Sequence, residues 1–325
     1  MNRKLLLLAL VLLTCLGVKA QGATAMLQSG EKFSVFYGPD ALQQAYDAAT
    51  DGDAITLSVG TFTPLSDNMK KQLKITGASA FEENSNTNIE SMTISANDVQ
   101  IEGIKFTSKL YATLADNLIL KHCYVETLTA GRNNNKTLID QCGIAKVEMM
   151  KFFKDFTFKN STIGYFSSDN TNASDNIGNI TNCVIYNFSS GKTIKAIYRN
   201  NIFCVQGFSQ ETIECAEPSE FYNNFAFNIS MLEAGTWATF KFSDNCINVN
   251  NTNSGDNVIL EDRTERYPAQ TKNEPTGDDG TKVGIYGGTG FTSLPSIPSV
   301  TEKYIDLSTN EDGKIHVELK AKVNK

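Results

Sequence analysis

The sequence predicts an all-β protein: a right-handed, single-stranded parallel β-helix with an N-terminal capping helix and a C-terminal β-hairpin segment. Three observations support this fold class. A short phrase returns about every twenty residues, an amphipathic helix precedes its first copy, and apolar and polar residues alternate near the C-terminus. With 325 residues, one elongated solenoid plus a terminal appendage accounts for the chain, and two globular domains are not needed.

Residues 1–20 read as a secretory signal peptide. Arg3 and Lys4 form its basic head, residues 5–13 are its apolar run, and residues 18–20 offer a cleavage site. The run is too short to span a bilayer, so we expect no transmembrane segment after the signal is removed. Cys15 follows Thr14, whereas a smaller residue is expected before a lipidated cysteine. Soluble export to the periplasm, cell surface or medium is therefore expected rather than a lipid anchor.

Residues 21–250 are expected to form the β-helix and its cap. Pro39 and Asp40 open a helix, and a turn at residues 51–53 leads into a strand over residues 54–57. A short amphipathic helix before the first coil would plug the open core, as the terminal repeat of a solenoid requires. The apolar face of this helix comprises Leu42, Ala45, Tyr46 and Ala49.

The repeated phrase has the pattern apolar-x-(Asn or a substitute)-(small or Cys)-x-apolar, and its copies follow at steps of 18 to 23 residues. Leucine-rich repeats need a different leucine pattern, and hexapeptide helices need a strict multiple of six. The remaining interpretation is a parallel β-helix with three short strands per coil joined by turns. The copies lie at residues 101–106, 120–125, 139–144, 158–163, 180–185, 198–203, 221–226 and 243–248.

One column of the repeat is rich in asparagine and is expected to form a ladder in which each side-chain amide bonds to the next coil, roughly 4.8 Å away. His122 belongs to this column, and a structural role in the ladder is expected for it as well. The residue before the column alternates in charge over four coils, which predicts an exposed row of ion pairs. The ladder column is His122, Gln141, Asn160, Asn182, Asn200, Asn223 and Asn245, and the charged row is Glu102, Lys121, Asp140 and Lys159.

Six cysteines follow the signal peptide. Four of them fall in one inward column, where free buried thiols stack well. A bridge between Cys204 and Cys215 stays open, because export permits disulfides. Paired C-x-x-C spacing is missing and the chain has two histidines, so no metal site is expected. The inward column is Cys123, Cys142, Cys183 and Cys246.

Residues 40–57, followed by Gly60-Thr61-Phe62, resemble the N-terminal cap and first coil of pectin-lyase-like β-helix proteins, and the coils to about residue 250 fit that superfamily. Residues 279–288 (DGTKVGIYGG) resemble an ending of secreted β-helix proteins from gut-type Gram-negative bacteria, many of which have no assigned activity. The resemblance implies a substrate cleft over one strand of each coil. Its outward residues would be Thr93, Tyr111, Thr113, Thr127, Thr129, Glu148, Asn187 and Gln206.

This row offers little for catalysis. A lyase needs a base and a cation that neutralises the substrate carboxylate, and a glycosidase needs two carboxylates. Glu148 is the one catalytic candidate, no cofactor is expected, and calcium would enter only with a lyase, since it needs several converging carboxylates. Arg199 is a candidate for a sugar-carboxylate contact, with a structural role as the alternative. The substrate-binding candidates are thus Tyr111, Thr113, Thr129, Glu148, Asn187, Gln206 and Arg199.

Residues 251–325 are expected to form a loop-rich C-terminal capping segment that ends in a β-hairpin. Its strands are predicted at residues 304–307 and 314–323, around the turn at residues 310–313. The hairpin is expected either to cover the C-terminal face of the solenoid or to form a small separate module.

Three functions remain open. The leading one is a non-catalytic exported β-helix, expected to be a monomer, that binds a polysaccharide or cell-envelope partner along its flank. The alternatives are a polysaccharide lyase or glycoside hydrolase acting on an acidic glycan, and a structural or adhesive envelope protein. A net charge of −7 with five arginines argues against nucleic acid as a partner.

Overall fold

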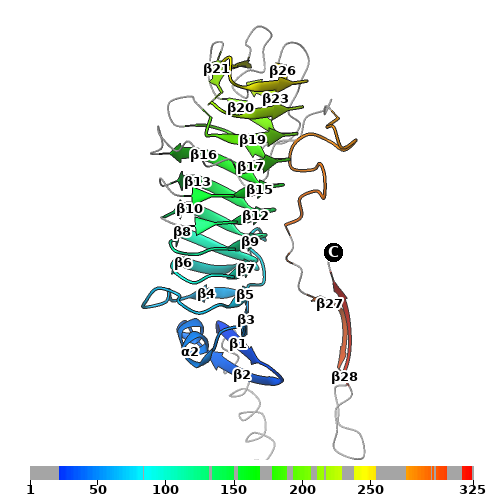
Figure 1. Ribbon diagram of the computed structural model, residues 1–325. Coiled ribbons are helices and arrows are strands. Elements are labelled where there is room, and N and C mark those ends of the chain that lie inside the picture. Colours follow the sequence, from blue (N-terminus) through cyan, green and yellow to red (C-terminus); the bar gives the residue numbers. More distant parts are fainter. Residues whose placement is uncertain are drawn as a thin grey trace, which may run out of the picture.

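The computed structural model describes residues 22–82, 84–131, 134–149, 153–168, 178–188, 193–205, 211–215, 217–228, 238–253, 276–293, 295, 298–305 and 317–323. It confirms the predicted fold class: the chain is nearly all β and winds into a parallel β-helix (Figure 1). The predicted signal peptide, residues 1–20, lies outside the described residues.

Two long sheets run along the solenoid. Sheet 1 consists, in order, of β2 (Lys32–Tyr37), β1 (Thr24–Ser29), β3 (Ala54–Leu57), β5 (Lys74–Thr76), β7 (Gln100–Glu102), β9 (Ile119–Lys121), β12 (Leu138–Asp140), β15 (Thr157–Lys159), β17 (Gly178–Thr181), β19 (Ala196–Arg199), β22 (Glu220–Tyr222) and β25 (Ile247–Val249). Sheet 2 consists of β4 (Gly60–Phe62), β6 (Thr87–Ile94), β8 (Ile104–Ala112), β10 (Tyr124–Ala130), β13 (Gly143–Met149), β16 (Thr162–Ser168), β18 (Val184–Ile185), β20 (Ile202–Val205), β23 (Phe225–Asn228) and β26 (Thr252–Asn253).

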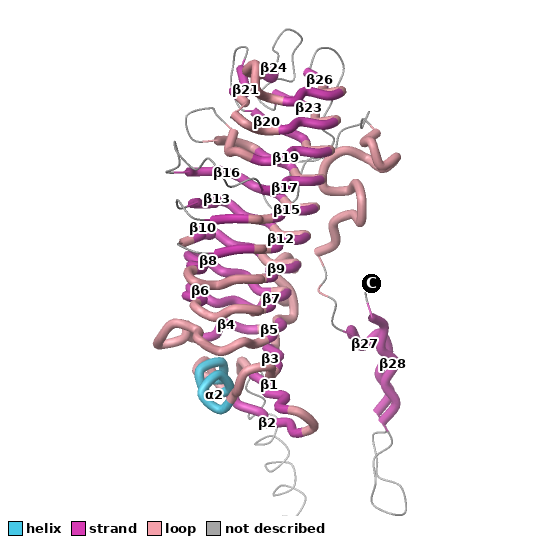
Figure 2. The backbone as a smooth tube through the Cα atoms, in the orientation of Figure 1, coloured by secondary structure: helices cyan, strands magenta, loops and turns pink. Residues whose placement is uncertain are grey.

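Two strands of each coil meet at a turn, visible in Figure 2 between the two rows of strands. One residue of this turn has a positive φ, a conformation that glycine and asparagine tolerate better than other residues. This requirement explains why asparagine recurs in the sequence. The last member is Asn250 and not Asn245, so the final copy of the repeat was predicted in the wrong register. The column is Gly103, His122, Gln141, Asn160, Asn182, Asn200, Asn223 and Asn250, with φ between 45° and 67°.

The third strand of the coil is not separate in the lower half of the solenoid. There β6, β8 and β10 each continue past an irregularity in register, such as the one between Val125 and Thr127, and supply a further face. The predicted third strand at Leu128 and Ala130 is thus the second half of β10. Two short pairs complete the coils: β11 (Asn134–Asn135) with β14 (Phe153–Lys154), and β21 (Glu211–Glu214) with β24 (Ala238–Lys241).

The side-chain amides that hydrogen-bond to one another from coil to coil lie one residue after the predicted column. Asn201 Oδ1 accepts a hydrogen bond from the Cys183 backbone at 2.8 Å, and Asn224 Oδ1 accepts one from the Asn201 amide group at 3.0 Å. Asn251 Oδ1 in turn accepts one from Asn224 Nδ2 at 2.8 Å. These side chains point inward and satisfy backbone groups at the bend, whereas the predicted column points outward.

The same inward column holds thiols in the lower coils. Cys123, Cys142 and Cys183 are fully buried and free, as predicted, and burial raises the pKa of Cys183 to about 12. Cys246 forms no disulfide either, but it is only half-buried, because its copy of the repeat is out of register. Cys204 and Cys215 are not joined by a disulfide.

The predicted row of exposed ion pairs is wrong for two of its four members. Glu102 and Asp140 are buried, with 8% and 7% of their surface exposed. The Glu102 carboxylate lies 3.0 Å from His122 Nδ1 inside the turn. His122 therefore has a structural position, next to a carboxylate that was expected at the surface.

The upper coils are filled by aromatic rings. Phe166 stacks on Phe188 at 5.6 Å between ring centroids, and Tyr198 stacks on Phe221 at 4.6 Å. Offset stacking of this kind adds to the apolar burial that holds successive coils together.

The N-terminal cap is α2 (Ala41–Ala48), whose Ala41, Leu42 and Ala45 are buried against the first strands. This confirms the capping helix that the sequence predicts. The antiparallel hairpin β1–β2, which the sequence analysis did not predict, precedes it and adds two strands to the edge of sheet 1.

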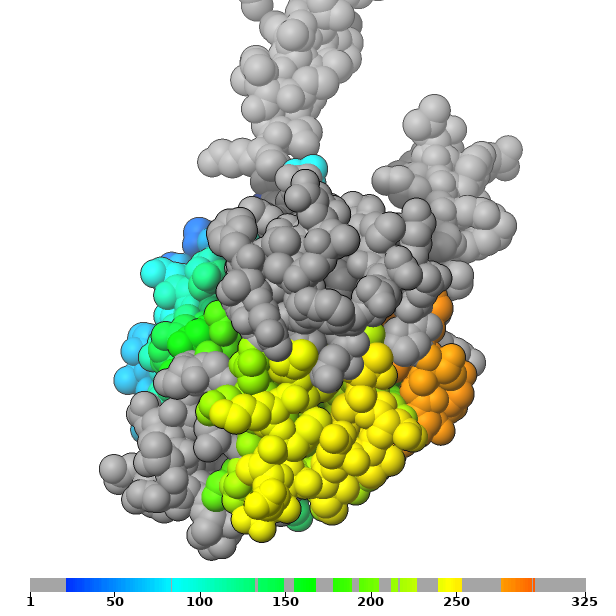
Figure 3. Space-filling model, turned by 90° about the horizontal axis from the view of Figure 1, so that it is seen from above, coloured from blue at the N-terminus to red at the C-terminus, as the bar shows by residue number. Residues whose placement is uncertain are grey.

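Part of the C-terminal region runs back along the solenoid instead of capping its last coil. We call residues 276–293 the strap; it is the orange segment beside the upper coils in Figure 1 and at the side of the molecule in Figure 3. After it, β27 (Pro298–Ile305) and β28 (Val317–Val323) form an antiparallel sheet of their own, far from β25 and β26 in Figure 1. The predicted inward and outward alternation of β28 falls on side chains that lie outside those described.

Candidate functional site

Sheet 2 arranges outward side chains of successive coils in rows along the solenoid. One row is Thr93, Tyr111, Thr129, Glu148 and Ser167, and a second is Ser91, Lys109, Thr127, Lys146 and Tyr165. The first row confirms the predicted alignment of Tyr111, Thr129 and Glu148. We call Lys109, Tyr111, Thr129, Lys146, Glu148 and Tyr165 the flank patch.

Glu148 is the centre of the flank patch. Its Oε1 lies 2.7 Å from Lys146 Nζ, and its Oε2 lies 3.6 Å from Lys109 Nζ and accepts a hydrogen bond from Thr129 Oγ1 at 2.9 Å. Lys109 Nζ also lies 5.8 Å from the centre of the Tyr111 ring. The carboxylate is thus held by three partners from three coils, and Thr129, predicted to be accessible, is fully buried beneath it.

These partners set the protonation state of Glu148. The hydrogen bond from Lys146 and then that from Thr129 lower the pKa of the Glu148 carboxyl below its usual range. The same contact raises the pKa of Lys146. A carboxyl with a lowered pKa is ionised at neutral pH and is a poor proton donor, and the Glu148 carboxylate already has three partners. The geometry therefore suits a fixed charge that positions two lysines.

Other predicted residues are not brought into the flank patch. Thr113 is half-buried just after the end of β8. Its Cβ lies close to Gly131, 3.0 Å from where a Cβ atom added to that glycine would be. Asn187 is exposed, but its Oδ1 accepts a hydrogen bond from the Phe188 backbone at 2.8 Å. Gln206 lies outside the described residues.

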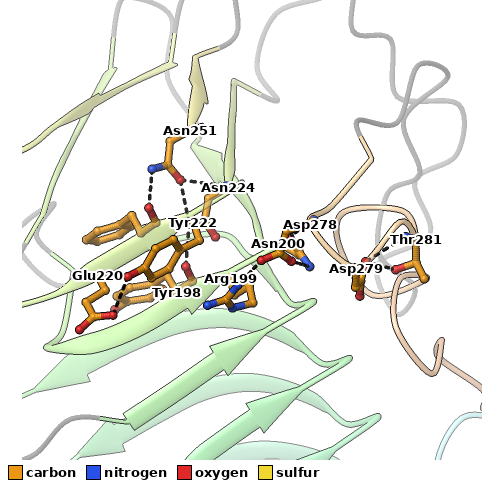
Figure 4. A network of polar contacts seen from close by, with 11 residues as sticks. Tyr198, Arg199, Asn200, Glu220, Tyr222, Asn224, Asn251, Asp278, Asp279 and Thr281 are labelled. Atoms are coloured by element: carbon orange, nitrogen blue, oxygen red, sulfur yellow. Dashed lines mark hydrogen bonds and ion pairs between the residues drawn. The ribbon is translucent and has the colours of Figure 1, made fainter. Parts of the chain in front are cut away.

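Arg199 lies on sheet 1, not on the face of sheet 2 that carries the flank patch. Its guanidinium forms an ion pair with Asp278 of the strap and stacks 4.6 Å above the Tyr222 ring (Figure 4). Asn200 Nδ2 donates to the same carboxylate at 3.0 Å. These contacts favour the structural role that the sequence analysis gave as the alternative for Arg199, because they attach the strap to sheet 1.

The outward-pointing side chains of the asparagine-rich turn column bind the strap through hydrogen bonds. Asn160 Nδ2 donates to the carbonyl oxygens of Ile285 at 2.9 Å and Gly287 at 2.6 Å, and Asn182 Nδ2 donates to that of Lys282 at 3.3 Å. Gln141 Oε1 accepts from the Thr292 backbone at 2.8 Å. Sequence reasoning missed this pairing, although the sequence signal, residues 279–288, had been noted as a motif.

Apolar contacts reinforce the strap. Val283 and Ile285 are buried on the outer face of sheet 2 against side chains of the upper coils, in a cluster separate from the main core. Phe291 meets Phe81 edge-on at 5.4 Å, in the loop between β5 and β6. The apolar side chains of the upper coils in this cluster are Val184, Ile202, Cys204 and Phe225.

Replacing Glu148 by glutamine should make stability less sensitive to acid. Because the folded-state pKa of Glu148 is lowered, its ionisation stabilises the fold above its usual pKa of 4.5, and this contribution is lost as the pH falls through that value and below. Urea unfolding of both proteins at pH 7 and pH 3 tests this. We expect the Glu148→Gln variant to be less stable than the parent at pH 7 and this deficit to be smaller at pH 3; an unchanged difference would contradict the charge network.

The described residues contain no cluster of three or more histidine, cysteine or acidic side chains that could hold a metal ion. Their single helix, α2, has eight residues, whereas a helix that crosses a bilayer needs about twenty. No protein-family model matches the chain, and no curated protein or solved structure is significantly similar to it.

Proposed function

We propose that this protein is an exported, non-catalytic β-helix of the pectin-lyase-like type that binds a polysaccharide or cell-envelope partner along its flank. The observation that carries the proposal is the flank patch. It presents tyrosine and lysine side chains on coils that are stacked about 4.8 Å apart, with Lys109 and Lys146 two coils apart in one row. A polar and aromatic surface that extends over several coils suits an extended ligand.

The chemistry of the flank patch favours a hydroxyl-rich glycan over a strongly anionic one. Lys109 and Lys146 both contact the single Glu148 carboxylate, so one of their two positive charges is compensated and only one remains to attract an anionic ligand. Tyr111 and Tyr165 are half-buried and combine an apolar ring with a polar hydroxyl, as side chains at wet interfaces commonly do. Hydrogen-bonding side chains with fixed positions then provide specificity.

The enzymatic alternative has less support. Glu148 is ionised and already has three partners, which suits neither a general acid nor a free base. An assay for uronate release with and without calcium tests this alternative directly. Turnover that is abolished in the Glu148→Gln variant would replace our proposal with a lyase.

Glycan arrays with the exported protein test the binding proposal. Tyr111→Ala and Tyr165→Ala should each weaken binding to any glycan detected by at least about tenfold, because each removes an aromatic contact that loses about 1.4 kcal/mol or more. The matched control is Tyr286→Ala, since Tyr286 is a 38% exposed tyrosine on the strap. An array without any bound glycan would favour the structural alternative, and equal losses in all three variants would argue against the flank patch.

A further inference from the structure

The outermost strand of sheet 1, β2, has a free edge with an unusual surface. β2 ends the order of the sheet, and no described strand pairs with its outer side. Three alternate side chains on one face of β2 are large and exposed: Phe33 at 60%, Val35 at 46% and Tyr37 at 69%. Natural proteins usually protect such edges with charges, proline or bulges.

The backbone of the same three residues faces the free edge. Gly38 N donates to Ala23 O at 2.7 Å, which fixes the pairs of β1 and β2 that are hydrogen-bonded. Bonded pairs alternate along an antiparallel ladder, so Ser34 and Phe36 face β1. Phe33, Val35 and Tyr37 therefore direct their N–H and C=O groups away from β1.

This edge is self-complementary. The exposed residues read aromatic–valine–aromatic, so a two-fold axis through Val35 aligns Val35 with Val35 of a second copy and Phe33 with the second copy's Tyr37. In this antiparallel register the outward backbone groups exchange hydrogen bonds and the exposed side chains meet on one face. We propose that β2 is the docking edge for a second copy of this chain and that the protein forms a two-fold dimer.

Charge complementarity supports the same register. Lys32, the first residue of β2, is exposed, and so is Asp40, which follows the last residue of β2 by three positions as the N-cap of α2. The two-fold pairing places Lys32 opposite Gly38 of the second copy. Lys32 and the second copy's Asp40, which carry opposite charges, therefore lie at the same end of the interface.

The other edge of sheet 1 is a poorer partner for β2. β25 has three residues, whereas β2 has six, and a β2–β25 contact would leave both outer ends open. A head-to-tail contact of that kind builds filaments, but the two-fold contact closes and uses up both β2 edges. The proposed dimer differs from the monomer that the sequence analysis expects.

Sedimentation velocity over a range of protein concentrations tests the proposal. We expect reversible dimerisation of the full exported chain, and we expect Val35→Lys to abolish the dimer over the same range, because two ammonium groups would face each other on the axis. Val249→Lys is the matched control, since Val249 is 39% exposed on β25. A monomer at every concentration, or a dimer that survives Val35→Lys, would overturn the proposal, as would filaments lost in Val249→Lys.

Cysteine cross-linking tests the register. In a hydrogen-bonded pair the Cα and Cβ atoms of opposite residues both lie about 5.5 Å apart, slightly too far for a direct disulfide but within reach of a short thiol-specific cross-linker. Val35→Cys should therefore give a covalent dimer with such a reagent, Phe33→Cys alone should not, and a mixture of Phe33→Cys with Tyr37→Cys should. Cross-linking of Phe33→Cys to itself, or none in Val35→Cys, would rule out the two-fold axis at Val35.

Discussion

Gly287→Ala will detach the strap from the solenoid. A Cβ atom at residue 287 would lie 1.8 Å from Lys282 O and 2.3 Å from Asn182 Nδ2, and the first of these is backbone that cannot move alone. The turn between Lys282 and Gly287 would have to open. Ile285 and Val283 would then leave the surface of sheet 2, and burial of each contributes about 1.5–3 kcal/mol.

Hydrogen exchange followed by mass spectrometry measures this effect. Amides of residues 276–293 should exchange at least about 100-fold faster in Gly287→Ala, which corresponds to about 2.7 kcal/mol, while amides of β9 and β12 keep their protection. Gly280→Ala is the matched control. Gly280 has a positive φ, of 76°, but nothing lies within 4 Å of its Cβ position, so only a conformational cost of about 1–2 kcal/mol applies. Equal exchange in both variants would contradict the steric argument.

Asn201→Ala will lower the free energy of unfolding by about 2–4 kcal/mol. Asn201 is fully buried, and its Oδ1 is the acceptor for the Cys183 backbone N–H. Its Nδ2 donates to Ile180 O at 2.7 Å and to Asn224 Oδ1 at 3.0 Å. Alanine leaves a buried donor without this acceptor and also leaves a cavity, and both effects destabilise.

Chemical denaturation of the Asn201→Ala and Asn179→Ala variants measures the free energy of unfolding of each. Asn179 lies on the neighbouring strand β17 but is exposed, so its replacement should change stability by no more than about 0.5 kcal/mol. If the two variants were equally stable, the hydrogen bonds of the inward amide ladder would make no measurable contribution to the free energy of unfolding.

The sequence predicts the path of the chain better than the partners of its side chains. Turn residues such as Asn160 and Asn200 were found because a positive φ selects asparagine locally. Their partners were not found, because Ile285 lies 125 residues from Asn160 and no local period connects them. The inward ladder was placed in the wrong column for the same reason: adjacent asparagines, such as Asn200 and Asn201, have the same local signal and opposite directions.

The flank patch shows a similar division. Period-two alternation aligned Tyr111, Thr129 and Glu148 correctly, because outward residues of consecutive coils follow from register. Lys146, whose hydrogen bond is the largest cause of the lowered pKa of Glu148, was missed, and so was Lys109. They occupy the second outward row of the same strands, directly after the irregularity between Val125 and Thr127. The free edge at β2 has no repeat at all, so periodicity gave no indication of it.

The direction of the strap has a consequence for biogenesis. It descends while the coils ascend, so a growing polypeptide meets its anchoring points in reverse: Asp278 joins Asn200 before Thr292 reaches Gln141. A product truncated before residue 283 has nothing to place on Val184 and Ile202, so these apolar side chains stay exposed to solvent. They are covered only once synthesis has passed Ile285, long after the coils that carry them have been made.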